Sequence, residues 1–383
     1  MTATRHYLDH NATTPLCGAA RDAMAKAFDV VGNPSSVHAF GRGARGLVEA
    51  GRRALADAMG TTPDRVVFTS GASEANNQII CHAAEAGWPV HVSAVEHLSV
   101  RDAFEERTVL PVDAAGRIDL DALEALLPQI DDDGGAGEPF LVCVMFANNE
   151  TGVIQPVRAV ADLVHARGGY VHVDAVQGLG KVPMDPSALG ADYLSVSAHK
   201  FGGPAGIGAL VRMGCAPDPV ALIRGGGQER NRRAGTENLI GVAGMAGALG
   251  AVGERLAEID RIGALRDKLE DALVAISPDV TIYGKGAERL ANTSCFSAPG
   301  VSAETAVIRF DLAGVAVGSG SACSSGKVSP SHVLEAMGAD RHHTASAIRV
   351  SLGPETTKDD IEAAIAVWKA IAAGVRQEGA AAA

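Results

Sequence analysis

The chain has 383 residues, of which 47% are hydrophobic, 20% charged and only 4% aromatic. Its formal net charge is −12, from 33 basic and 45 acidic residues, which argues against a nucleic-acid or anionic-membrane surface because such surfaces need basic patches. The length suggests about two or three domains' worth of sequence. Because the net charge is negative, an anionic ligand must be held by a local pocket rather than by the electrostatic field of the whole protein.

The chain start, MTATRHYLDH, lacks the apolar core of a signal peptide, so we do not expect export. The six cysteines stand at positions 17, 81, 143, 215, 295 and 323, with no C-x-x-C pair. We therefore expect neither a disulfide framework nor a metal site, and a reducing cytoplasm fits this spacing.

Strand-like and helix-like segments alternate through the first two thirds of the chain, which is typical of an α/β fold with a largely parallel sheet. In chain order, the expected strands and helices are RVVFTSG (65–71, strand), ASEANNQIICHAAEAG (72–87, helix), PVHVSAVEH (89–97, strand), FLVCVMF (140–146, strand), QPVRAVADLVHARG (155–168, helix), YVHVDA (170–175, strand), YLSVSA (193–198, strand) and GIGALVRM (206–213, strand). The stretch DDDGGAGEP at 131–139 is expected to be a mobile surface loop. The Gly-rich stretch at 239–253 is too short to span a bilayer, so we expect a small-residue helix in a core or subunit interface.

The pattern changes after about residue 250. Residues 253–276 show apolar residues at three- and four-residue steps and predict one long amphipathic helix, and residues 358–375 predict a closing helix. We expect a large α/β domain over 14–250 and a smaller α+β domain formed by 1–13 and 251–383.

Polar residues follow several of the expected strands. Lys200 follows the strand 193–198 among small residues, where it is either a surface lysine or a Schiff-base lysine for a carbonyl cofactor. Asp174 closes the strand YVHVD, and a carboxylate at that depth needs a cationic partner such as a protonated pyridine nitrogen. Either residue alone is a weak signal.

The stretch TSGASEANN at 69–77 joins a strand to a helix and suits a phosphate, although an ordinary capped helix has the same pattern. Glu96–His97 and the stretch NNETG at 148–152 also follow strands. Ligands of open α/β sheets bind outside the carboxyl ends of the strands. The sequence therefore predicts a ligand site at this edge.

Together these motifs resemble the cysteine desulfurases of the NifS/IscS type, in the class-V aminotransferase family of fold-type I pyridoxal-phosphate enzymes. The resemblance runs from residue 7 to residue 353 through YLDHNATTP, GNPSSVHAFGR, FTSGASEANN, EHLSV, NNETGVIQP, HVDAVQ, SAHKFGGPAGIGAL, GGGQERNRRAGTEN, GSACSSG and IRVSLG. It implies an aspartate aminotransferase-like fold, a pyridoxal 5'-phosphate cofactor, a homodimer, L-cysteine as substrate and an iron–sulfur scaffold or another protein as sulfur acceptor.

The resemblance also implies a role for each site residue. Lys200 would form the Schiff base with the cofactor and later move protons at the substrate α-carbon. The other cofactor contacts would be Asp174 at the pyridine nitrogen, Gln177 at the ring hydroxyl, His97 stacked on the ring with a role in acid–base steps, and Ala72, Ser73, Ser197 and His199 at the phosphate. Thr236 would reach the phosphate of the neighbouring subunit.

For the substrate, the resemblance implies that Arg349 clamps the carboxylate, with Asn149 beside it. Cys323, in the stretch GSGSACSSG at 318–326, would attack the substrate sulfur and hold it as a persulfide, or hold an iron–sulfur cluster transiently. The competing interpretation of that stretch is a plain flexible loop with an incidental thiol. Two alternatives remain for the whole chain: a selenocysteine lyase or other pyridoxal-phosphate β-lyase, and a non-catalytic sulfur-binding scaffold.

Overall fold

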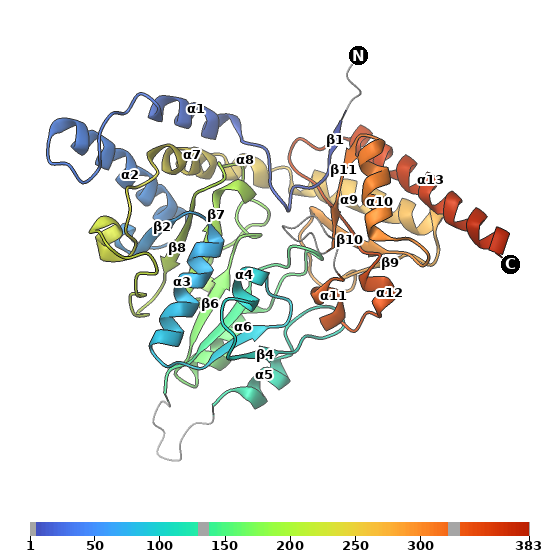
Figure 1. Ribbon diagram of the computed structural model, residues 1–383, viewed down its shortest axis with the longest axis horizontal. Coiled ribbons are helices and arrows are strands. Elements are labelled where there is room, and N and C mark those ends of the chain that lie inside the picture. The colour runs from blue at the N-terminus through green and yellow to red at the C-terminus, as the bar shows by residue number, and fades with distance from the viewer. Residues whose placement is uncertain (1–4, 129–137, 321–329, 383) are drawn as a thin grey trace.

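A computed structural model describes residues 5–128, 138–320 and 330–382. The chain forms a large part around one wide sheet and a smaller part that contains most of the C-terminal third (Figure 1). The loop expected at 131–139 lies almost entirely outside the described residues, and so does Cys323 with the rest of 321–329.

The large sheet has seven strands in the order β2-β8-β7-β6-β5-β3-β4. Their bounds are β2 Val66–Thr69, β3 Val90–Ser93, β4 Arg107–Leu110, β5 Leu141–Met145, β6 Tyr170–Asp174, β7 Tyr193–Ser197 and β8 Gly208–Arg212. Strands β4, β3, β5, β6 and β7 run parallel, whereas β8 is antiparallel to both β7 and β2. The predicted α/β fold with a largely parallel sheet is confirmed.

Helices cover both faces of this sheet, which explains why its central strands are apolar throughout. Strand β5 directs Val142 and Val144 into one core and Leu141 and Cys143 into the core on the other face. The helices of the large part are α1 Gly18–Ala27, α2 Ala39–Ala58, α3 Ala72–Glu85, α4 Leu98–Arg101, α5 Leu120–Leu126, α6 Val157–His165 and α7 Leu239–Gly250, with short turns of 3-10 helix at η1 Pro63–Arg65, η2 Pro186–Leu189, η3 Ala198–Lys200 and η4 Gln228–Asn231. Helices α2, α6 and α7 contribute to the first core, and α3 to the second.

Helix α7 is the small-residue helix expected between 239 and 253, and it packs against α1 and α2 in the core. A Cβ at Gly247 would lie 2.5 Å from the carbonyl oxygen of Ala19 and 2.8 Å from the Cα of Ala20. The absence of a side chain at this position lets the two helix backbones approach closely.

The smaller part contains an antiparallel sheet in the order β12-β13-β10-β9 and a parallel pair of β1 and β11. Its elements are β1 His6–Tyr7, β9 Thr281–Ile282, β10 Thr293–Ser297, β11 Val315–Ala316, β12 Gly318–Ser319, β13 Ile348–Ser351, α8 Val252–Leu256, α9 Ile259–Ile276, α10 Ala303–Leu312, α11 His332–Ala336, α12 Arg341–Thr344 and α13 Lys358–Ala382. Buried side chains from α9, α10 and α13 share a core with this sheet. We propose 14–250 and the combination of 1–13 with 251–383 as the two domains.

The single long helix expected over 253–276 is wrong, because the chain forms α8 and α9 with a break at 257–258. The two helices bury their side chains in different places. Arg255 of α8 is buried beside the turn at Gly180, whereas Leu265 and Leu269 of α9 enter the core of the smaller part. The break therefore lies where the chain changes from packing on the large part to packing in the core of the smaller part.

Of the helices in the described parts of the chain, none is long and apolar enough to cross a membrane.

We predict opposite effects of alanine at two glycines of α7. Gly247→Ala should lower the free energy of unfolding by about 1–3 kcal/mol because the new methyl group forces α7 away from α1. Gly250→Ala is the matched control: nothing lies within 4 Å of its Cβ position, so stability should stay the same or rise slightly. Chemical denaturation of both variants measures the difference, and equal stabilities would contradict the packing described.

Candidate active site

A cavity of about 840 Å³ opens at the carboxyl ends of β6 and β7 and is bounded on its other side by residues of the smaller part. The structure brings ten of the predicted site residues to its wall: Ala72, Ser73, His97, Asn149, Asp174, Gln177, Ser197, His199, Lys200 and Arg349. These residues come from separate segments, as expected where parallel strands end together. Thr236 is exposed and does not line this cavity.

Lys200 ends the short helix η3 that follows β7, and its ammonium contacts the N-terminal segment. Its Nζ donates to the carbonyl oxygens of Asn11, at 2.6 Å, and Ala12, at 2.9 Å. Burial lowers the pKa of Lys200 to about 8; the positive charge of Arg349 acts in the same direction, and Asp174 opposes it. A lysine with this pKa is a far better nucleophile at neutral pH than an exposed one.

Asp174 ends β6 with its carboxylate held in a fixed orientation. One oxygen accepts the backbone N–H of Val176 at 3.0 Å, and the other accepts Nδ2 of Asn76 at 2.9 Å. Sequence reasoning missed Asn76. The available signal was its spacing, since Asn76 lies one helical turn after Ala72 and therefore on the same face of α3.

A second carboxyl group, Glu96, is fully buried behind this edge of the sheet. Its Oε1 accepts the backbone N–H of Met145 at 2.6 Å. Burial, and secondly the negative charge of Asp174, raise the pKa of Glu96 well above its usual value. Glu96 is therefore harder to ionise than an exposed glutamic acid, and it holds the end of β5 through its hydrogen bond to Met145.

The turn between β2 and α3 presents the backbone of Ser70 and Gly71 at one end of the cavity. It packs directly on β8, because a Cβ at Gly208 would lie 2.7 Å from the Cα of Gly71. The free N–H groups and dipole of the 14-residue helix α3 favour an anion here.

His199 and Ser197 lie at the same end as this turn. Burial lowers the pKa of His199 to about 4, and the charges of Lys200 and Lys181 act in the same direction. Its Nδ1 lies 3.2 Å from Oγ1 of Thr13. His199 is therefore a neutral imidazole, which can donate one hydrogen bond to an anion without adding charge.

Gln177 is oriented by Lys181, a buried residue that sequence reasoning missed. The Nζ of Lys181 donates to Oε1 of Gln177 and, at 2.7 Å, to Oδ1 of Asn11. The Nε2 of Gln177 donates to the carbonyl oxygen of Asn11 at 3.1 Å. Burial, and secondly the charge of Lys200, lower the pKa of Lys181 well below its usual value. No local sequence signal separates Lys181 from a surface lysine.

Arg349, on β13, forms the opposite wall of the cavity. Its Nη2 donates to Oδ1 of Asp9 at 2.7 Å, and its Nη1 donates to the carbonyl oxygen of Asn149 at 3.2 Å. The Nε of Arg349 is buried without a partner among the described residues. A buried guanidinium with an unused donor suits a carboxylate ligand.

His97 lies at the mouth of the cavity, where its Nδ1 accepts the backbone N–H of Ser99 at 3.1 Å. Burial lowers the pKa of His97. The negative charge of Asp174 opposes this shift, and the positive charge of Lys200 adds to it. His332 also lines the cavity, and its Nε2 lies 3.0 Å from the carbonyl oxygen of Glu96. Gly320 and Pro330, which flank the segment with Cys323, line the cavity as well.

The residues present fit pyridoxal phosphate. The cavity offers an anion site at the start of α3, an amine with a lowered pKa at Lys200 and an oriented carboxylate at Asp174. These three groups match a phosphate, a carbonyl carbon and a pyridinium nitrogen. The described residues include no cluster of His, Cys, Asp or Glu that could hold a metal ion.

Comparisons with known proteins point to the same chemistry. The family model "Aminotransferase class-V" matches residues 6–364. The chain is 40% identical over 380 residues to "Cysteine desulfurase IscS" of Dictyoglomus turgidum, covering 95% of this chain and 94% of that protein.

Solved structures give the same result. The chain is similar to the NifS-like protein of Rickettsia africae, with a TM-score of 0.86, 34% identity and coverage of 96% of this chain and 99% of that one. It is also similar to SspA in complex with cysteine, with a TM-score of 0.76, 27% identity and coverage of 92% and 100%.

We predict that the neutral amine of Lys200 controls cofactor capture. The rate at which cofactor-free protein forms a borohydride-reducible adduct with pyridoxal phosphate should rise about tenfold per pH unit below 8 and level off above it. Arg349→Gln should move this midpoint upward, because the guanidinium helps to lower the Lys200 pKa. Comparing the two proteins cancels the titration of the reagent itself. Identical midpoints would contradict the assigned cause.

Proposed function

The chain belongs to the class-V aminotransferase family and is a pyridoxal-phosphate-dependent cysteine desulfurase, and we propose that the cavity beside Lys200 is its active site. The enzyme converts L-cysteine to L-alanine and transfers the sulfur to an enzyme cysteine. The observation that carries the site assignment is the joint presence of Lys200, Asp174 and Arg349 around one cavity. Each supplies a different function that this reaction needs.

The cofactor supplies an electrophilic carbon and an electron sink when bound, and the chain supplies its orientation. Lys200 would hold it covalently, and Asp174, fixed by Asn76, would pair with the pyridine nitrogen. Gln177, held by Lys181, would donate to the ring hydroxyl, and His97 would stack on the ring. Ala72, Ser73, Ser197 and His199 would hold the phosphate at the start of α3.

The substrate is held at the opposite wall of the cavity. Arg349 binds the carboxylate of L-cysteine, with Asn149 beside it, which directs the α-carbon toward Lys200. The Lys200 amine would remove and return protons at that carbon, a task that its pKa of about 8 permits near neutral pH.

The sulfur step uses Cys323, which lies outside the described residues. Its thiolate attacks the sulfur of the bound cysteine, so that a sulfur–sulfur bond forms while the carbon–sulfur bond breaks. The electrons of the broken bond stay with the carbon skeleton, which takes up a proton and leaves as L-alanine. The enzyme retains the persulfide, and no external oxidant is needed.

The alternatives from the sequence are not favoured. The curated relatives are named cysteine desulfurases, which does not favour a selenocysteine lyase or a general β-lyase. A non-catalytic sulfur scaffold would have no use for a buried lysine beside an oriented Asp174.

The family donates sulfur to acceptors, and we propose an iron–sulfur scaffold protein in the cytoplasm as the acceptor for this chain. We also propose that the enzyme works as a homodimer. Thr236 would reach the partner's cofactor phosphate, which explains why it is absent from the cavity of its own chain. The segment between α1 and α2, together with the first turn of α2, supports this proposal with large exposed apolar side chains: Phe28, Val31, Val37 and Phe40.

We predict that Cys323→Ala separates cofactor chemistry from sulfur transfer. The variant should bind pyridoxal phosphate normally, and its absorbance should still change when L-cysteine is added, because the cavity wall is intact. Alanine and sulfide should not form, because no thiolate reaches the substrate sulfur. Alanine release measured beside the spectral change tests this.

The matched control is Cys215→Ala, which removes an exposed free thiol that does not line the cavity. It should retain turnover. Near-normal alanine release by Cys323→Ala would exclude the proposed thiol mechanism and favour a β-lyase.

We predict that the active species sediments as a dimer. Thr236→Ala should leave the dimer intact and weaken retention of pyridoxal phosphate, because one hydrogen bond to an ionised phosphate contributes about 1.5–3 kcal/mol. Sedimentation velocity and cofactor titration measure the two effects separately. A fully active monomer would contradict the assigned role of Thr236.

A further inference from the structure

Three successive residues before Thr236 adopt the left-handed backbone conformation, which residues other than glycine rarely adopt. Glu229, Arg230 and Asn231 have φ values of 48°, 58° and 66°, and they are the only described non-glycine residues with positive φ. Such a turn persists only where the surrounding structure enforces it. The contacts of this turn therefore indicate what it is for.

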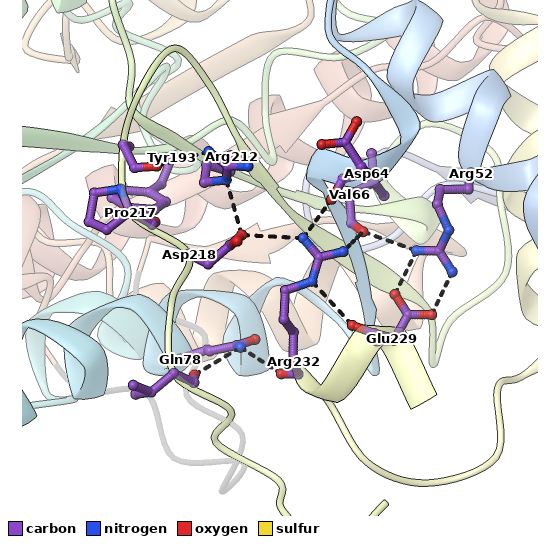
Figure 2. Close-up of polar contacts among 12 residues, drawn as sticks. Arg52, Asp64, Val66, Gln78, Tyr193, Arg212, Pro217, Asp218, Glu229 and Arg232 are labelled. Carbon is purple, nitrogen blue, oxygen red and sulfur yellow. Dashed lines mark hydrogen bonds and ion pairs between the residues drawn. The ribbon is translucent and has the colours of Figure 1, made fainter. Parts of the chain in front are cut away.

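Glu229 supplies the first restraint, through a buried ion pair with α2 (Figure 2). Its two carboxylate oxygens accept Nη1 and Nη2 of Arg52 at 2.6 and 2.8 Å. One of them also accepts the backbone N–H of Phe68, in β2, at 3.0 Å. These three hydrogen bonds use three of the about four acceptor positions of a carboxylate, which fixes the orientation of the side chain.

Arg232 supplies the second restraint, directly after the strained turn. It donates to the carbonyl oxygens of Asp64 at 2.6 Å and Val66 at 3.2 Å, as Figure 2 shows. Its own carbonyl oxygen accepts Nε2 of Gln78, in α3, at 2.9 Å. Arg52 donates to the same Val66 carbonyl at 3.0 Å, so both arginines hold one point of the chain. We call Arg52, Glu229 and Arg232 the ion cluster.

The residues that follow the ion cluster bring the chain to the surface of the protein. Arg233 pairs with Glu74 at 2.9 Å, beside the phosphate turn of its own chain. Gly235 and Thr236 are exposed, and Thr236 is the residue assigned to the partner's phosphate. A shift of the turn at 229–231 would displace Thr236, because few residues separate them.

We propose that the ion cluster is a positioning device: it holds the left-handed turn that presents Thr236 to the cofactor site of the neighbouring subunit. This inference rests on the proposed function and on the homodimer within it. Buried ion pairs add little net stability compared with apolar packing, but they demand one geometry. That property is what a segment contributing to another subunit's active site requires.

The first experiment replaces the carboxylate with an amide of the same shape. In Glu229→Gln, an NH₂ group must face donors of Arg52 or Phe68, so the turn loses its restraint. The dissociation constant of pyridoxal phosphate from the homodimer should rise about tenfold or more. Arg52→Lys is a second, milder variant that keeps the charge but loses the paired hydrogen bonds. An unchanged dissociation constant in both folded variants would overturn the proposal.

The matched control is Glu85→Gln. Glu85 accepts two hydrogen bonds from Arg224, at 2.7 and 2.9 Å, in the same connecting segment, but both side chains are exposed. The substitution is the same acid-to-amide change in an Arg–Glu pair, although both hydrogen bonds to Glu85 come from the single nitrogen Nη2 of Arg224. Cofactor binding should stay unchanged, because exposed ion pairs contribute little.

The second experiment tests whether the cluster acts across the dimer. Two differently tagged chains are co-expressed, one with Glu229→Gln and the other with Lys200→Ala, and the mixed dimer is isolated. Its single intact Lys200 belongs to the Glu229→Gln chain but receives Thr236 from a chain with a normal ion cluster. The borohydride-reducible adduct should therefore form with wild-type affinity for pyridoxal phosphate.

The reciprocal dimer pairs a wild-type chain with a Lys200→Ala/Glu229→Gln chain. Here the intact Lys200 belongs to the wild-type chain, and it receives Thr236 from the chain with Glu229→Gln. The affinity for pyridoxal phosphate should therefore fall about tenfold or more. The opposite pattern would overturn the proposal, because the cluster would then act within its own chain through β2 and α3. Failure of the proposed function looks different: Lys200→Ala homodimers would still give a reducible adduct.

Discussion

The burial of the Lys200 ammonium beside the guanidinium of Arg349 is the constraint on which the site depends. Two cations near one cavity repel each other, and neither can leave water without compensating partners. The N-terminal segment supplies those partners: the carbonyls of Asn11 and Ala12 accept from Lys200, and Asp9 pairs with Arg349. This explains why residues 9–12 cross from the smaller sheet to the edge of the large one. Burial, and secondly the charge of Arg349, still lower the pKa of Lys200 to about 8, which keeps part of the amine neutral near physiological pH.

The same constraint reconciles an acidic protein with an anionic cofactor. The chain as a whole carries a formal charge of −12, so its overall field repels anions. Within the cavity, the start of α3 attracts a phosphate, and Arg349 attracts a carboxylate at the opposite wall. His199 stays uncharged because Lys200 and burial both lower its pKa. Anionic groups are therefore attracted by two local sites in the cavity and not by the net charge, as the composition predicted.

Local pattern predicted most of the strands and helices, and the resemblance to the cysteine desulfurases implied the chemistry, but neither revealed the contacts that orient the site residues. The unit FLVCVMF–helix–YVHVDA was predictable because strand and helix periodicity are written in consecutive residues, and the structure confirms it as β5, α6 and β6. The helix break at 257–258 was not predictable, since no Gly or Pro marks it. It accompanies tertiary packing: Arg255 packs beside Gly180, and Leu265 packs in the core of the smaller part. Asn76 and Lys181 escaped for a related reason: their partners Asp174 and Asn11 lie about a hundred or more residues away in sequence.

The smaller part also places both described ends of the segment that contains Cys323 at the cavity. Gly318 pairs with Arg349 in the sheet, and a Cβ there would lie 2.8 Å from Nη2 of Arg349 and 3.0 Å from Oδ1 of Asp9. A larger residue at position 318 would therefore displace this ion pair. Gly320 before the segment and Pro330 after it both line the cavity. This placement is the structural reason for proposing Cys323 as the thiol of the sulfur step.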